Sequence, residues 1–81
     1  MGKSQKQESQ QKEILRLSSL AESGQAEAQN VLAARLAQGY GVKTDIAGAF
    51  YWYAQAVALG YTHAKWNAGT MLLAGEGLPA P

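Results

Sequence analysis

The sequence contains no cysteine, a single histidine, no excess of one charge and no long apolar run. Without cysteine the chain forms neither disulfide bonds nor thiolate metal sites, and His63 alone cannot supply the histidine pair or Cys–His cluster of a usual zinc site. Seven Lys and Arg residues against six Asp and Glu leave a formal net charge of +1. This balance argues against nucleic acid or an anionic membrane as a partner. No apolar run approaches the roughly 20 residues of a membrane span.

Alanine and glycine are what the chain has in abundance. Hydrophobic residues make up 47% of the sequence, but alanine dominates them and bulky aliphatic residues are fewer. Alanine has the highest helix propensity, and small side chains let helices approach closely. In a chain of 81 residues such a core is thin, and below roughly 80 residues a single core supplies only a few kcal/mol. We therefore expect an all-α domain held by stacking of neighbouring helices rather than by one globular centre.

Apolar residues that recur at intervals of three and four predict helices separated by glycine-containing turns. The expected helices span residues 13–23, 25–38, 46–59 and 63–74. Gly24 and Gly60 end the first and third helices, where glycine readily takes the left-handed conformation. Asp45, or Thr44 beside it, is expected to cap the third helix, and Thr62 the fourth. The short turns at Gly24 and Gly60 predict two antiparallel hairpins.

The N-terminal segment is polar and low in complexity. We expect residues 1–12 to be disordered or frayed, or to extend the first helix into solvent. They contain no apolar stretch of a secretory signal, so the sequence as given predicts a cytoplasmic location. A periplasmic or secreted location stays open for a longer parent protein.

When the sequence is aligned with itself at an offset of 36 residues, identical residues coincide at several positions. The identical pairs are Gly24 and Gly60, Ala28 and Ala64, Leu36 and Leu72, Gly39 and Gly75, and Gly41 and Gly77. The glycines fall at predicted helix ends, and the Ala and Leu pairs share one helical face. A helix-turn-helix period of about 20 to 50 residues is typical of an α-solenoid. We divide the chain into repeats 13–42 and 43–78, followed by a tail, 79–81, that starts a missing repeat; a plain four-helix bundle is the alternative.

The residues around these glycines carry a longer pattern. Its positions are Gly39-Tyr40-Gly41-Val42, Asp45, Ala49, Trp52-Tyr53, Ala56 and Gly60, followed by Ala64, Ala68-Gly69 and Gly75-Glu76-Gly77-Leu78. In order and spacing this resembles the Sel-one-like repeat family, a relative of the tetratricopeptide repeat, over residues 17–79. The departures are Gly48 and Gln55 in place of lysines, Ala33 in place of glycine, and Leu36 and Leu72 in place of an aromatic.

The resemblance implies an α/α solenoid, a right-handed superhelix of helix pairs similar to the tetratricopeptide fold. Family members act as adaptors in bacterial and eukaryotic complexes, which implies a protein or peptide partner bound on the concave face. That face is lined by the first helix of each pair. We therefore expect partner contacts from Tyr51 and Gln55, from Leu15 and Ser19 one repeat earlier, and from Glu22 at the edge. The alternative for each is an ordinary solvated surface residue.

The sequence indicates no catalytic residue, no cofactor and no metal site, and we expect that the chain is not an enzyme. His63 begins a predicted helix, and the six acidic residues are scattered. Gly39-Tyr40-Gly41 and Gly75-Glu76-Gly77 end helices and follow no strand, unlike phosphate-binding loops. The aromatic run at residues 50–53 lacks the basic residues of a nucleic-acid platform.

The C-terminal end of the predicted solenoid has no neighbour to cover it. Met71, Leu72 and Leu73 would then form an exposed apolar surface, and such patches mark contact sites. A structural unit that forms homo-oligomers through this end is therefore the second hypothesis for the function.

Overall fold

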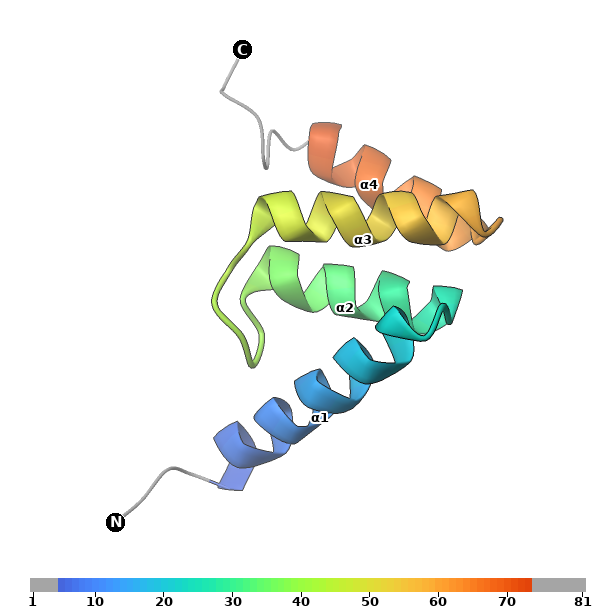
Figure 1. Cartoon of the computed structure of the whole chain (residues 1–81). Coiled ribbons are helices and arrows are strands. Elements are labelled where there is room, and N and C mark those ends of the chain that lie inside the picture. Colours follow the sequence, from blue (N-terminus) through green and yellow to red (C-terminus); the bar gives the residue numbers. More distant parts are fainter. Residues whose placement is uncertain (1–4, 74–81) are drawn as a thin grey trace.

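A computed structural model describes residues 5–73 of the chain and the side chains of residues 8–69. Within that part every regular element is an α-helix, as expected, and there is no strand. The helices are α1 (Gln5–Glu22), α2 (Ala26–Gln38), α3 (Ile46–Ala58) and α4 (Thr62–Leu73). Figure 1 shows them stacked in chain order, with successive helices running in opposite directions. No helix within residues 5–73 combines the length and apolar character needed to cross a membrane.

The turns of the two hairpins have the same backbone hydrogen bonds. In each turn a glycine with positive φ, +97° at Gly24 and +87° at Gly60, follows the helix. This glycine donates to the carbonyl three residues earlier, and the next residue donates to the carbonyl five residues earlier, which defines a Schellman motif. The bonds are Gly24 to Ala21 (3.0 Å), Gln25 to Leu20 (3.1 Å), Gly60 to Val57 (2.8 Å) and Tyr61 to Ala56 (3.0 Å). The predicted role of both glycines is confirmed.

The first helix begins at Gln5, so residues 5–12 are helical rather than disordered or frayed. Of the two expectations for this segment, extension of the first helix is the one found; residues 1–4 lie outside the described part. Gln, Lys and Glu are good helix formers even without apolar periodicity. Tertiary contacts also hold this part of α1: the loop at Gly41 lies against Gln10, and Glu13 forms an ion pair with Arg35 of α2 at 3.1 Å.

The other helix boundaries agree with the expected ones to within one residue, and the end of α2 and the beginning of α3 coincide with them. The Asp45 carboxylate accepts a hydrogen bond from the Gly48 N–H at 2.9 Å, so Asp45 rather than Thr44 caps α3. Thr62 is the first residue of α4, not a residue preceding it. The boundary between the expected repeats falls in the loop between α2 and α3, and the tail 79–81 lies outside the described residues.

The core consists of two clusters of mostly small buried side chains. Between α1 and α2 lie Leu17, Ala21, Ala28 and Leu32. Among α2, α3 and α4 lie Ala33, Ala49, Tyr53, Ala56 and Ala64. Trp52 of α3 and Leu36 of α2 pack against both clusters. Helices contact mainly their neighbours in the chain, most extensively α2 with α3, so the core is spread along the stack.

Gly41 and Gly24 offer a matched pair of substitutions. Both have positive φ, but a Cβ at Gly41 would lie 2.8 Å from the Cβ of Gln10, whereas one at Gly24 would meet nothing within 4 Å. We expect Gly24→Ala to lower the free energy of unfolding by about 1 kcal/mol, through backbone strain alone. Gly41→Ala should lower it by about 2 to 3 kcal/mol, because the loop must also move away from α1.

Urea unfolding followed by circular dichroism measures both effects. An equal decrease in the free energy of unfolding for Gly24→Ala and Gly41→Ala would show that the contact between the Gly41 loop and α1 contributes nothing to stability.

Candidate functional site

All five residues expected to contact a partner are exposed, but the structure brings only three of them together. Glu22 of α1 and Tyr51 and Gln55 of α3 line one hollow. Leu15, 70% exposed, and Ser19 do not line it. The reason is the tilt of α1, which approaches α3 at its C-terminal end and diverges from it toward its N-terminus (Figure 1).

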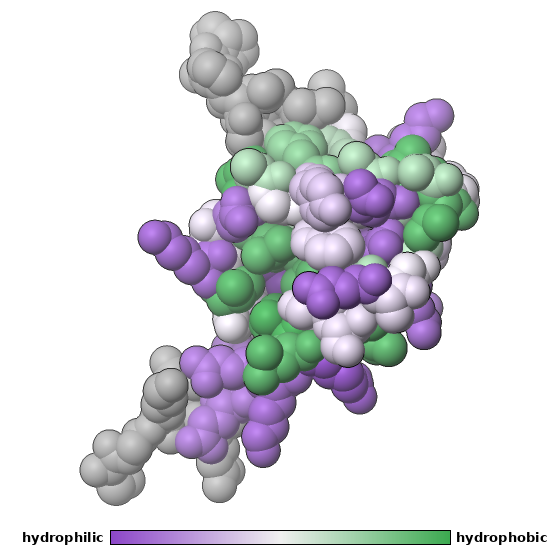
Figure 2. All heavy atoms as spheres, viewed as in Figure 1, coloured by the Kyte–Doolittle hydropathy of each residue, from purple (hydrophilic) through white to green (hydrophobic). Residues whose placement is uncertain are grey.

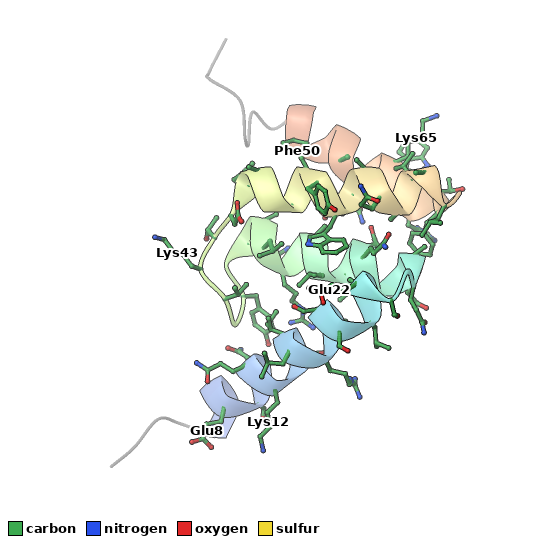
Figure 3. The ribbon with its side chains drawn as sticks, viewed as in Figure 1. Glu8, Lys12, Glu22, Lys43, Phe50 and Lys65 are labelled. Carbon is green, nitrogen blue, oxygen red and sulfur yellow. The ribbon has the colours of Figure 1, made fainter. Side chains whose placement is uncertain are left out.

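The hollow has a volume of about 380 Å³ and is open to solvent. It lies where the end of α1, the α1–α2 turn, the beginning of α2 and the C-terminal half of α3 meet. Its lining residues are Ala21, Glu22, Gly24, Gln29, Tyr51, Trp52, Gln55, Ala58 and Leu59. Figure 3 places Glu22 beside the crossing of α1 and α2. The volume lies at the lower end of the roughly 300 to 1,000 Å³ found for ligand sites.

Two neighbouring aromatic residues form one wall of the hollow. Trp52 is partly buried and packs against both core clusters. Tyr51 is 57% exposed, and its ring meets that of Trp52 edge to face, with centroids 5.0 Å apart and planes at 80°. The core therefore fixes Trp52, and Trp52 in turn supports the exposed ring of Tyr51.

Gln29 is the polar residue of the lining that was not among the expected partner contacts. Its side chain is buried, with 4% exposure, and its Nε2 donates to the Ala21 carbonyl at 3.0 Å. A carbonyl only accepts, so the orientation of the amide is fixed. The Oε1 atom is also buried but has no hydrogen-bond partner in the described part of the protein. Buried polar atoms are normally paired, so this acceptor calls for an explanation.

A signal for Gln29 is present in the sequence. Ala26, Ala33 and Leu36 pack against the core, and Gln29 stands in the same stripe at intervals of three and four. A polar residue in an apolar stripe is expected to be buried with it.

Among the described residues that line the hollow, Glu22 is the one Asp, Glu, Lys, Arg or His residue. The hollow therefore combines a negative charge with aromatic rings, and the buried amide of Gln29 belongs to its lining. The molecular surface in Figure 2 is mixed, with hydrophilic side chains crowded over the N-terminal half of α1 and hydrophobic ones distributed along the rest of the stack.

Arg35 and His63 lie outside the lining of the hollow. Arg35 pairs with Glu13, and its guanidinium lies 4.4 Å from the centre of the Tyr40 ring, which ties the loop after α2 to α1. His63 is exposed and lies near the ring of Tyr61, with centroids 5.6 Å apart. Among the described residues, no three His, Cys, Asp or Glu side chains are grouped as metal ligands would be.

No protein-family model, curated protein or solved structure matches this chain. The resemblance to the Sel-one-like repeat family therefore depends on the sequence pattern and stays a prediction.

Substitution of the two adjacent aromatics should have very different effects on stability. Trp52→Ala removes packing from both clusters and should lower the free energy of unfolding by about 3 kcal/mol. Tyr51→Ala removes a largely exposed ring and its contact with Trp52, and should lower it by about 1 kcal/mol or less. Denaturant unfolding of both variants measures the difference, and a larger effect at Tyr51 would contradict the assignment of Trp52 as the anchoring residue.

Proposed function

We propose that the chain is a non-catalytic interaction module, which binds a peptide or an extended segment of another protein in the hollow between α1 and α3. The observation that carries the proposal is the convergence of Glu22, Tyr51 and Gln55 with the buried amide of Gln29 in one open hollow. We further propose that the two hairpins are repeats of a solenoid of the Sel-one-like kind.

Correspondences at a spacing of 36 residues support the repeat. The turns at Gly24 and Gly60 have the same hydrogen bonds. Several positions one repeat apart agree in burial: Ala28 and Ala64 are buried, as are Leu17 and Tyr53, whereas Leu15 and Tyr51, and Ser19 and Gln55, are exposed. Others differ, since Ala21 is buried and Val57 exposed, and Leu20 is exposed and Ala56 buried. Contacts mainly between chain neighbours are what stacked repeats require.

The physical character of the hollow supports a peptide as the ligand. Tyr and Trp are enriched at protein interfaces, and residues that dominate binding energy are often of these types. A hollow open to solvent accepts one or two side chains of a longer chain, which continues outside it. Because Trp52 is fixed by the core, little side-chain freedom is lost when a ligand packs against the wall, and this favours affinity.

A peptide selected on the immobilised protein from short random sequences displayed on phage tests this function. Tyr51→Ala should weaken binding of the selected peptide about tenfold, the loss expected when a central interface residue is truncated. Trp66→Ala is the matched control, because Trp66 is an exposed aromatic of α4 that does not line the hollow. Fluorescence anisotropy measures the affinities, and circular dichroism verifies that each variant is folded.

Two results would contradict the proposal. One is a selection that enriches no peptide above an unrelated immobilised protein; the other is equal binding by the parent chain and Tyr51→Ala.

Self-assembly through α4 is the second candidate, and the exposure of Trp66 favours it. Trp66 is 72% exposed. Its counterpart one repeat earlier is Asn30, which accepts a hydrogen bond from Asn67 of α4 at 2.9 Å and so lies on the side of α2 that faces the following hairpin. Trp66 therefore lies where a further hairpin, or a second copy, would pack. The side chains of Met71, Leu72 and Leu73 lie outside the described part.

If α4 pairs with a second copy, the average mass in sedimentation equilibrium should rise toward that of a dimer as the concentration increases. Trp66→Ala should weaken this association about tenfold, because an exposed aromatic would be buried in the interface. Tyr51→Ala should leave it unchanged. A constant monomer mass over the whole concentration range would exclude this candidate.

A further inference from the structure

We infer that the hollow is selective for a cationic side chain, so that its ligand is a peptide that inserts a lysine or an arginine next to Glu22. This inference rests on the proposed peptide-binding function and adds the chemistry of the residue that is recognised. It depends on three properties of the lining: its charge, its unpaired acceptor and its aromatic wall.

The charge of the lining has one sign. Glu22 is exposed and supplies the negative charge, and none of the described Lys, Arg or His residues contributes to the same lining. A cation in the hollow would therefore meet attraction without a competing repulsion. A carboxylate or phosphate would be placed next to Glu22 and would be repelled, because like charges at short range are unfavourable. Because the charge of the lining is negative, we expect the bound group to be positively charged.

The Oε1 of Gln29 is buried and accepts no hydrogen bond from a described residue. Its amide cannot turn to present the NH₂ group instead, because Nε2 is held by the Ala21 carbonyl. Lysine offers three donors and arginine five, and neither offers an acceptor. A cationic side chain can donate to the carboxylate of Glu22, and it would reach the buried Oε1 of Gln29 only if the lining moved to expose that atom. An acidic side chain would face these acceptors with acceptors of its own.

The aromatic wall favours the same ligand. Cations are attracted to the faces of Trp and Tyr rings, and Tyr51 and Trp52 both line the hollow. The protein already contains this arrangement in a complete form: Arg35 lies between the carboxylate of Glu13 and the ring of Tyr40. The hollow presents a carboxylate and aromatic rings, and its lining contributes no cation of its own.

The test uses the full chain and peptides selected from random sequences displayed on phage. We expect the selected peptides to be enriched in Lys or Arg. For one such peptide, Glu22→Gln should weaken binding about fivefold at low salt, within the range of partly exposed charge pairs, and by less at high salt. Glu27→Gln is the matched control, because Glu27 is an exposed acid of α2 outside the lining.

Replacing the basic residue of the peptide by norleucine completes a double-substitution cycle. If the cation contacts Glu22, the norleucine peptide should bind the parent chain and Glu22→Gln equally, so that the two losses are not additive. In an NMR titration, the side-chain amide signals of Gln29 should shift with the cationic peptide and much less with the norleucine peptide. This readout requires no substitution in the core.

The outcomes separate the two proposals. If no peptide binds, the proposed function fails and this inference fails with it. If peptides bind but are not enriched in basic residues, or if Glu22→Gln behaves as Glu27→Gln, the cation selectivity is overturned while peptide binding stands. Binding without movement of the Gln29 signals would overturn the role given to its Oε1.

Discussion

Packing of the Trp52 indole against both groups of buried residues is the contact on which the arrangement depends. The cluster around α3 is mostly alanine, the cluster between α1 and α2 is half alanine and half leucine, and Trp52 is the α3 side chain that reaches both. Small side chains allow close helix contact but bury little apolar area, so the helices need a larger group to join the two clusters. The same indole faces the hollow. Stability and the candidate binding surface therefore share one residue, and α3 cannot shift relative to α1 without changing both.

Alanine in the core and glycine in the turns work together in this chain. The Schellman turns at Gly24 and Gly60 reverse the backbone at once, so each helix must lie directly against the one before it. Close approach then requires small residues at the contact, such as Ala28 and Ala64, which are both buried. In the solenoid that we propose, each hairpin leaves one side to be covered by the next. The exposure of Trp66 on α4 agrees with that proposal.

Features set by local chemistry could be predicted from the sequence, and those set by helix placement could not. Gly24 and Gly60 were predictable because a left-handed turn needs glycine, and Asp45 because its carboxylate can cap a helix. The beginning of α1 could not be predicted, because residues 5–12 have no apolar periodicity. The helix is supported there by contacts of Gln10 and Glu13 with residues distant in the sequence. Side-chain direction on the helices predicted that Tyr51 and Gln55 are exposed. It could not show that Glu22 joins them while Leu15 and Ser19 do not, because this depends on the tilt of α1.

Gln29 gives the clearest reason to regard the hollow as more than a gap between helices. A core made mostly of alanine has little packing energy to offset a buried acceptor without a donor, and an apolar residue at this position would continue the stripe of Ala26, Ala33 and Leu36. The amide instead fixes the end of α1 through the Ala21 carbonyl and leaves Oε1 buried without a partner among the described residues, in a residue that lines the hollow together with Glu22 and Tyr51. Departures from local folding rules tend to occur at functional sites, where a ligand supplies what the fold lacks. The missing donor, the single negative charge and the aromatic wall are all satisfied by one type of ligand group, a cation that carries several N–H donors.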